Sequence, residues 1–310
     1  RVRILSENIE RMGIRNALVL NETPERLAER FPCYFDRILV DAPCSGEGMF
    51  QKNEIAVSEW SLENVELCAK RQAEILKSAS KMLAFGGRMV YSTCTFSKEE
   101  NESVIEEFLG RHPEFALIEA KRLYPHRIKG EGHFAAVLEK RSELSVQERA
   151  YGCSLQKSLR LKDFPELKSF LDETIKEPEE LVKSPGKGVL IRFGERLFSA
   201  PEGTPELSGL KVLRPGLLLG EMKKKRFEPS HALALALKPG EVFRQASFCL
   251  YDQEEAGDRA VISDYLKGLT FKYPGENGYY LICVDGCSLG FGKLANGVMK
   301  NHYPKSLRKA

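Results

Sequence analysis

Long apolar runs are missing from this sequence, and their absence excludes a first class of protein. No segment approaches the roughly eighteen consecutive apolar residues that a membrane-spanning helix needs. The N-terminal residues also lack the charged-then-apolar order of a secretion signal. Internal repeats and low-complexity tracts are absent as well. We therefore expect a protein that neither crosses a membrane nor is secreted.

Cysteine pairs at the spacing of a metal site or a disulfide framework are also missing. The eight cysteines are scattered through 310 residues, which is typical of reduced thiols and predicts a cytoplasmic protein. Cys283 and Cys287 form a lone C-x3-C without a second pair, so we expect no metal site. A free cysteine is usually a small buried apolar side chain. We expect this of Cys33, Cys68, Cys153 and Cys249.

The composition that is present describes an ordinary globular chain, with 42% apolar and 29% charged residues. The net charge is +3, but residues 211–310 hold 16 Lys or Arg against 10 Asp or Glu, a local charge of +6. Such an excess favours a polyanionic partner. The basic run from Lys223 to Arg226 is either a nucleic-acid contact or a solvated face, and the sequence leaves both open.

Short apolar runs alternate with helical patterns from residue 1 to about residue 140, which predicts an α/β domain with a mainly parallel sheet. A first helix follows Leu5, Ile9 and Met12 and stops at Gly13. Because Arg1 already lies inside this pattern, we expect an N-terminal part to be missing. The predicted strands are 17–20, 37–41, 88–92, 115–119 and 134–139.

Helices are predicted between these strands. Thr23 followed by Pro24 is typical of a helix start, and a long helix covers about 62–83 and stops at the following glycine pair. Ser97 and Glu100 have the spacing of a capping box, which predicts that they start a further helix ending near residue 110.

The alternation is lost after residue 139, where a polar stretch predicts a linker. The next segment predicts a small α+β unit with a helix at 167–175 and strands at 189–193 and 196–200. The last one has apolar runs broken by Asp-Gly and other glycines, as in hairpins, and predicts a mostly β module. The predicted domains are therefore 1–142, 150–222 and 226–310.

Two further cysteines follow predicted strands: Cys44 in "VDAPCSGEG" and Cys94 in "YSTCTFSKEEN". Ligands of an open α/β sheet bind beyond the C-terminal ends of its strands. If the two strands are neighbours, as a single helical crossover suggests, both thiols face one cleft. A turn also lets backbone N–H groups favour the reactive thiolate. Asp41 lies at the same strand end, where its carboxylate either contacts a ligand or only caps the turn before Pro43.

These motifs carry a resemblance to a known family. "FDRILVDAPCSGEG", Trp60, "RQAEILKSASKMLAFGGRMVYSTCTFSKEEN" and "YPHRIKGEGHFAAVLEK" resemble the RNA cytosine-5 methyltransferases of the Sun/nucleolar-protein family. "GEGHF" and the C-terminal "GFGKLANGVMKNHYPKSLR" are similar to its bacterial RsmF-type branch, which modifies small-subunit ribosomal RNA. The resemblance covers nearly the whole chain, and the paired DAPC and STC motifs are specific.

The resemblance implies a class I, Rossmann-like methyltransferase domain, incomplete at its N-terminus, then a small α+β domain and a PUA-like, β-rich RNA-binding module. It also implies S-adenosylmethionine as the cofactor. Two features of the family's cofactor site, a glycine-rich loop and an acidic ribose-binding residue, would precede Arg1. We therefore expect tight cofactor binding only from a full-length protein. Thr23 stands where relatives often carry an adenine-contacting Asp, so it either contacts adenine or only caps the helix.

The resemblance assigns chemistry to the cysteines. The C5 carbon of cytosine is a poor nucleophile, but a thiolate added at C6 makes it enamine-like and able to attack a methyl sulfonium. Carried over, Cys94 is the nucleophile and Cys44 assists release. The residues alone do not rank the two thiols, and the reversed assignment stays open. Asp41 would stabilise charge on the base and, with Pro43, border the methionine part of the cofactor.

The C-terminal module is expected to contact ribosomal RNA or the small subunit. Basic side chains would contact phosphates and interleaved rings would stack on bases, although an ordinary solvated surface is the alternative. The residues are Lys293, Lys300, Lys305, Arg308 and Lys309, with Phe291 and Tyr303.

The function implied is a monomeric cytosine-5 methyltransferase of ribosomal RNA. A tRNA-specific relative and a non-catalytic RNA-binding or ribosome-assembly factor are the alternatives, and a DNA methyltransferase fits less well. The presence of both cysteines favours an enzyme, while "GEGHF" and the C-terminal module favour ribosomal RNA.

Overall fold

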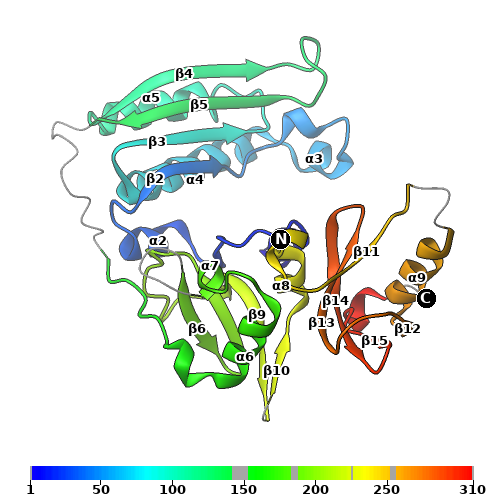
Figure 1. The fold of residues 1–310 in the computed structure, drawn as a ribbon. Coiled ribbons are helices and arrows are strands. Elements are labelled where there is room, and N and C mark those ends of the chain that lie inside the picture. The colour runs from blue at the N-terminus through cyan, green and yellow to red at the C-terminus, as the bar shows by residue number, and fades with distance from the viewer. Residues whose placement is uncertain (1, 142–152, 183–187, 225, 252–255, 309–310) are drawn as a thin grey trace. The chain divides into compact units, whose positions relative to one another are not determined.

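The computed structural model describes residues 2–141, 153–182, 188–224, 226–251 and 256–308 (Figure 1). The chain divides into two compact units. Glu22–Ser154 form the first, which we call the motif unit because it holds Cys44 and Cys94. Arg1–Asn21 and Leu155–Ala310 form the second, the C-terminal unit. This division differs from the predicted domains, since the first residues of the chain pack with its C-terminal part.

The motif unit is built on a four-stranded sheet with the strand order β2-β3-β5-β4 (Figure 1). Strands β2 and β3 are parallel, whereas β5 runs antiparallel to both β3 and β4. Strands β2, β3 and β4 therefore run in the same direction, as expected of a mainly parallel sheet, and β5 alone is reversed. Strand β5 runs antiparallel to β4 because a connection between parallel strands needs about a dozen residues or more, and the segment from Leu123 to His133 is too short. The bounds are β2 Phe35–Asp41, β3 Leu83–Thr93, β4 Phe115–Leu123 and β5 His133–Lys140.

Two long helices of the motif unit supply its core. Leu76 of α4 and Phe108 of α5 are buried in one cluster with Met89, Tyr91 and Leu138 of the sheet. The helices are α2 Pro24–Arg30, α3 Glu54–Glu59, α4 Leu62–Met82 and α5 Glu102–Arg111, with a 3-10 turn at Glu47–Met49.

The start of α2 confirms Thr23 as an N-cap, because its side chain accepts a hydrogen bond from Arg26 N. The helix predicted at about 62–83 is confirmed as α4, but the glycine pair is not what ends it. The helix ends at Met82, and the buried Leu83 already pairs with Phe35 in the sheet. Both glycines then lie within β3.

The predicted capping box of Ser97 and Glu100 is also wrong. Helix α5 begins at Glu102, with Asn101 as its N-cap residue. Ser97 Oγ donates to the Glu99 side chain instead. Glu100 is fully buried and bonds to another loop, which a helix-capping side chain at the surface would not do.

The C-terminal unit contains three sheets, with orders β10-β9-β7-β6, β11-β13-β14-β15-β12 and β1-β8. The strands predicted at 189–193 and 196–200 are confirmed as β6 Val189–Phe193 and β7 Arg196–Ala200. The predicted strand at 17–20 is present as β1 Val19–Leu20, but it pairs with β8 Val212–Arg214 and not with the motif-unit sheet. Apolar contacts explain this, since Leu18 and Leu20 pack against Ile191, Ala200 and Leu207.

The remaining strands of this unit are β9 Leu217–Lys223, β10 Arg226–Pro229, β11 Gln245–Phe248, β12 Phe271–Lys272, β13 Gly278–Val284, β14 Cys287–Ala295 and β15 Val298–Asn301. Its helices are α1 Val2–Arg11, α6 Pro165–Thr174, α7 Glu179–Val182, α8 His231–Ala236 and α9 Ala256–Lys267. Single 3-10 turns lie at Leu161–Asp163, Pro239–Glu241 and Lys305–Leu307.

One apolar core joins the middle and last segments of the C-terminal unit. Phe170 of α6 has its ring 5.2 Å from that of Phe227 in β10 and 6.0 Å from that of Phe291 in β14. Strands β9 and β10 also pair across the predicted boundary between residues 222 and 226. The two predicted domains therefore share their packing here.

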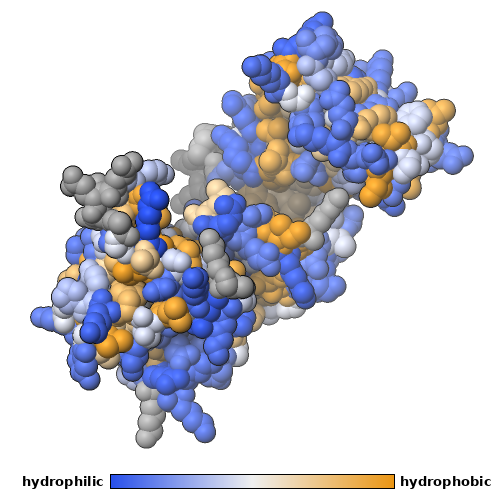
Figure 2. Space-filling model, turned by 90° about the vertical axis from the view of Figure 1, so that its right-hand side faces the viewer, coloured by the Kyte–Doolittle hydropathy of each residue, from blue (hydrophilic) through white to orange (hydrophobic). Residues whose placement is uncertain are grey.

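Surface properties complete the description. None of the helices in the described ranges is long and apolar enough to cross a membrane. Apolar side chains reach the surface, as orange areas among blue ones show in Figure 2, and Leu39 and Leu62 are among the most exposed. Scattered exposed apolar residues are normal on protein surfaces and mark no site by themselves.

Leu138→Ala should destabilise the motif unit by about 2–5 kcal/mol, because Leu138 is fully buried in its core and the change leaves a cavity. Leu117→Ala in the neighbouring strand should cost at most about 1 kcal/mol, since Leu117 is largely exposed. Urea unfolding followed by the fluorescence of Trp60, the only tryptophan, reports on this unit. Equal losses for the two variants would contradict the assigned core.

Candidate active site

The two strand-end cysteines lie together in the motif unit. Strand β2 ends at Asp41 and β3 at Thr93, and because these strands are parallel neighbours, the loops after them start at the same edge of the sheet. The expected strand pairing is thus confirmed. Cys44 Sγ lies 3.2 Å from Cys94 Sγ, and Cys94 N donates to Cys44 Sγ over 3.3 Å. Both thiols are free and partly exposed, so they form one sulfur pair that a ligand can reach.

The sulfur pair is electrostatically asymmetric. The contact with the Cys44 thiol lowers the pKa of Cys94 to about 7 from an ordinary 9.0, and His133 acts in the same direction. The same sulfur contact, with burial, raises the pKa of Cys44. When the pair loses a proton, the favoured form is therefore a Cys94 thiolate that accepts a hydrogen bond from the Cys44 thiol.

Asp41 and Pro43 stand beside the sulfur pair with their side chains exposed. The Asp41 charge acts on Cys94, whose pKa it raises against the stronger effect of Cys44. Among the described residues none donates a hydrogen bond to the Asp41 carboxylate, so the turn-capping interpretation finds no contact to support it. The Pro43 carbonyl accepts from Gln72 Nε2 at 2.9 Å, which ties the Cys44 loop to α4.

A buried carboxylate reaches from the Cys94 loop to the Cys44 loop. Glu100 accepts hydrogen bonds from Ser45 N at 3.0 Å and from Gln72 Nε2 at 2.9 Å, and its other oxygen contacts Ser45 Oγ. Glu100 is fully buried, and burial raises its pKa. Tyr91 of β3 holds the Glu100 backbone, since its hydroxyl donates to Glu100 O over 2.6 Å.

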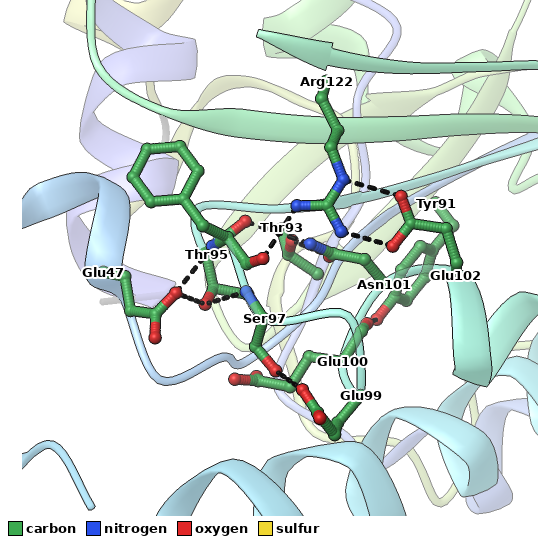
Figure 3. Close-up of polar contacts among 11 residues, drawn as sticks. Glu47, Tyr91, Thr93, Thr95, Ser97, Glu99, Glu100, Asn101, Glu102 and Arg122 are labelled. Atoms are coloured by element: carbon green, nitrogen blue, oxygen red, sulfur yellow. Dashed lines mark hydrogen bonds and ion pairs between the residues drawn. The ribbon is translucent and has the colours of Figure 1, made fainter. Parts of the chain in front are cut away.

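A second carboxylate reaches in the opposite direction. Glu47, three residues after Cys44, accepts from Thr95 Oγ1 at 3.0 Å and from Phe96 N at 2.9 Å. Figure 3 shows Glu47 pointing at this part of the Cys94 loop. Trp60 Nε1 donates to the remaining Glu47 oxygen over 2.9 Å. Each cysteine loop is thus held by a carboxylate of the other.

Further hydrogen bonds from Asn101 and Arg122 hold the Cys94 loop in place. Asn101 accepts from Thr93 Oγ1 at 2.6 Å and donates to Thr95 O over 3.0 Å (Figure 3). Arg122 of β4 donates to Phe96 O over 2.7 Å and pairs with Glu102 of α5. The loop that carries Cys94 is therefore bonded on both sides.

The "GEG" and "GEGHF" segments meet beside the site. Gly48 N donates to Cys94 O over 2.9 Å, and a Cβ on Gly48 would lie 2.3 Å from Gly132 O, so only glycine permits this approach. His133 follows, with its Nδ1 3.3 Å from Thr93 O. A carbonyl can only accept, so Nδ1 carries the hydrogen.

The site contains residues that the sequence did not single out: Glu100, Gln72, Glu47 and His133. All four lie inside the quoted motifs, and that position was the available signal. Glu100 was assigned to a helix cap, and Gln72 lies in a long helix whose pattern gives no sign of a buried polar contact.

The predicted RNA-contacting residues lie in the C-terminal unit. Lys293 of β14 and Lys300 of β15 are exposed and face each other across the two strands, and Lys293 Nζ lies 4.9 Å from the Tyr279 ring centroid. Lys305 is also exposed. Arg308 is partly buried, donates to Tyr303 O and lies close to Gly268.

The stacking role expected of Phe291 is wrong, because this ring is buried in the core. Tyr303 is half-buried beside Tyr265. Lys309 lies outside the described residues, as does Lys225 of the basic run.

The other cysteines differ among themselves. Cys68 is buried, as expected, whereas Cys153 and Cys249 are half-buried. The expectation for Cys33 is wrong: it is exposed in the turn before β2, with φ at 51°. Cys283 is buried and Cys287 exposed, on adjacent strands.

Three protein-family models match separate parts of the chain. Residues 1–139 match the family model described as 16S rRNA methyltransferase RsmB/F. Residues 169–237 match the RsmF rRNA methyltransferase first C-terminal domain, and residues 256–309 match the methyltransferase RsmF PUA domain.

Solved structures with similar sequence include "NSun6 from Pyrococcus horikoshii with SFG", at 31% identity over 46% of this chain and 39% of that one, with a TM-score of 0.41. A methyltransferase homolog protein from the same organism is 27% identical over 45% of this chain and 50% of that one, with a TM-score of 0.39.

Curated relatives cover the full length of the chain. The "Ribosomal RNA small subunit methyltransferase F" of Vibrio campbellii is 30% identical over 330 residues, which are 99% of this chain and 67% of the relative. Proteins of the same description from Vibrio cholerae and Aeromonas hydrophila are each 29% identical, over 67% and 66% of their own lengths. The chain thus spans about two thirds of these relatives and belongs to the RsmB/F family of 16S rRNA methyltransferases.

Proposed function

We propose that this chain carries the catalytic thiols of an S-adenosylmethionine-dependent cytosine-5 methyltransferase that acts on small-subunit ribosomal RNA. The observation that supports it best is the contact of 3.2 Å between Cys44 Sγ and Cys94 Sγ at the ends of two parallel strands. A nucleophile that must both add to a base and leave it again benefits from a second thiol within reach.

Cys94 is the proposed nucleophile because its thiolate is the favoured ionised form of the pair. The thiolate adds to C6 of the cytosine and makes C5 nucleophilic toward the methyl group. After methyl transfer, C5 loses its proton to water and the C6–S bond breaks, which returns the Cys94 thiolate. Cys44, the thiol with the raised pKa, assists this release by donating a hydrogen bond to the departing sulfur.

Asp41 is proposed to serve the base and the cofactor. Its exposed carboxylate can accept hydrogen bonds from the exocyclic amino group and protonated N3 of cytosine, which stabilises the charge that develops on addition. The same carboxylate would hold the ammonium group of S-adenosylmethionine, and Pro43 would border its methionine part; the bound cofactor would supply the methyl group as a sulfonium. Thr23 fits less well, since its side chain already caps α2.

The C-terminal unit is proposed to bind the RNA through Lys293, Lys300, Lys305 and Arg308. Lys293 and Lys300 are the strongest candidates, because they are exposed neighbours on one face of the sheet. Arg308 contributes less, since its guanidinium is bonded to Tyr303 O.

Cys94→Ala should lower methyl transfer to cytosine by about a thousandfold or more, because the attacking sulfur is removed. The measurement uses the intact protein, labelled S-adenosylmethionine and small-subunit ribosomal RNA. Cys44→Ala should instead accumulate a covalent protein–RNA adduct, seen as a shifted band on a denaturing gel. Cys33→Ser, a change of an exposed cysteine away from the pair, is the matched control and should leave transfer unchanged. If the adduct forms in Cys94→Ala but not in Cys44→Ala, Cys44 is the nucleophile and Cys94 assists release.

The alkylation of Cys94 should rise with pH around a midpoint near pH 7, because only the thiolate reacts and its pKa is lowered to about 7. In Cys44→Ala the midpoint should move up toward the ordinary thiol value, since the hydrogen bond that stabilises the thiolate is gone. Mass spectrometry of the Cys94 peptide after timed iodoacetamide treatment gives both midpoints. A downward shift in the variant would contradict the assigned direction of the sulfur contact.

Replacing Lys293 and Lys300 together by Gln should weaken RNA binding and reduce its logarithmic salt dependence by about 2, one unit for each lost phosphate contact. Lys267→Gln is the control, because this exposed lysine belongs to α9, which packs against the opposite face of the sheet. Filter binding across a salt series measures both quantities. If the control weakens binding as much as the double variant, the proposed surface is wrong.

A further inference from the structure

Two carboxylates connect the cysteine loops in opposite directions. Glu100 lies six residues after Cys94 and bonds to Ser45, the neighbour of Cys44. Glu47 lies three residues after Cys44 and bonds to Thr95, the neighbour of Cys94. The positions of the two sulfurs are thus coupled through the residues next to them.

A chain of oxygens joins the two carboxylates through the hydroxyls of Ser45 and Thr95. Glu100 Oε1 contacts Ser45 Oγ, Ser45 Oγ lies 2.9 Å from Thr95 Oγ1, and Thr95 Oγ1 lies 3.0 Å from Glu47 Oε2. These are three oxygen–oxygen contacts, but the two hydroxyls bring only two hydrogens. If both carboxylates were ionised, one of the three contacts would lack a hydrogen.

One additional proton on Glu100 Oε1 completes the chain. The acid group then donates to Ser45 Oγ, Ser45 donates to Thr95 Oγ1, and Thr95 donates to Glu47. The other Glu100 oxygen keeps its role as acceptor for Ser45 N and for Gln72 Nε2. Burial of Glu100 favours the same neutral state, and burial is also the main cause that raises its pKa.

Glu47 has the opposite environment. It receives hydrogen bonds from three donors, Thr95 Oγ1, Phe96 N and Trp60 Nε1, and its side chain is partly exposed. Because all three groups donate, the Glu47 carboxylate acts only as an acceptor.

We propose that Glu47 and Glu100 are reciprocal positioning residues that hold Cys44 against Cys94, with Glu47 as the anion and Glu100 as the neutral acid of one hydrogen-bonded chain. The proposal rests on the proposed function, in that the sulfur pair is the catalytic pair. It adds that two side chains that touch neither base nor cofactor set the distance between the thiols.

Because a glutamine resembles a neutral carboxylic acid and not an anion, it should replace Glu100 better than Glu47. At position 100 a glutamine reproduces the neutral acid, because its amide nitrogen donates to Ser45 Oγ while its oxygen accepts from Ser45 N and Gln72. At position 47 a glutamine must turn its NH₂ group either toward Trp60 Nε1 or toward Thr95 Oγ1 and Phe96 N, and it loses an accepted hydrogen bond on that side. Glu100→Gln should therefore be tolerated, and Glu47→Gln should not.

The test measures how fast diamide, a thiol oxidant, links Cys44 to Cys94 in this chain, with the disulfide mapped by mass spectrometry. The rate depends on the distance between the sulfurs and needs neither RNA nor cofactor. Glu47→Gln, Glu47→Ala and Glu100→Ala should slow the link by about tenfold, the effect of losing one or two hydrogen bonds. Glu100→Gln should stay within about twofold of the unmodified chain, and so should Glu99→Ala, which changes an exposed neighbour whose carboxylate accepts from Ser97 Oγ.

In the intact protein, kcat for methyl transfer should follow the same order, while KM for RNA stays unchanged. The comparison of the two glutamine variants is decisive even if the alanine variants fail to fold, since glutamine keeps size and shape. If Glu100→Gln forms the disulfide as slowly as Glu47→Gln, the proposal that Glu100 is a neutral acid is wrong. If the rate of disulfide formation is unchanged in Glu47→Gln and in a folded Glu100→Ala, the positioning role is wrong.

The experiment separates this proposal from the proposed function. If wild-type protein transfers no methyl group but the glutamine variants still differ in linking rate, the function fails and the positioning role stands. If transfer needs Cys94 but the variants do not differ, the positioning role fails alone.

Discussion

The parallel pairing of β2 with β3 is the constraint on which the rest of the site depends. Its register sets Asp41 opposite Ser92, so both strands end at nearly the same height and their loops leave the sheet side by side. Without this pairing the two cysteines, fifty positions apart in the chain, would have no reason to meet. The buried core of α4 and α5 against the sheet keeps the register, because a slip would move apolar side chains such as Met89 and Leu138 out of it.

The pairing brings the loops together, but it does not set the contact between the sulfurs. That finer placement depends on the hydrogen bonds between the loops, from Gln72 to Pro43 and from the carboxylates of Glu47 and Glu100. The close approach of Gly48 to Gly132 adds a steric limit from the "GEGHF" side. The asymmetry of the thiols then follows from their contact, since one sulfur can ionise only while the other donates to it.

Much of this arrangement could be predicted from the sequence, because strands and strand ends leave local patterns. The apolar run before Asp41 and the Ser-Thr-Cys sequence at the end of β3 were sufficient to place both thiols at one edge. The role of Glu100 could not be predicted, since its spacing from Ser97 fits a helix cap equally well and only the folded chain shows it buried. The strand at Val19–Leu20 was assigned to the wrong sheet for a similar reason: its partner, β8, lies almost two hundred residues away. Local periodicity identifies a strand, but long-range apolar contacts select its neighbour.

The central claim is that Cys94 attacks the cytosine while Cys44 stays a thiol. Small-subunit ribosomal RNA carrying 5-fluorocytosine tests it most directly, because fluorine cannot leave C5 as a proton does and the covalent adduct accumulates. The intact protein is incubated with this RNA and S-adenosylmethionine, digested, and the modified peptide is identified by mass spectrometry. The account predicts a methylated fluorocytosine bonded to Cys94. An adduct on Cys44, or none on either thiol, would contradict it.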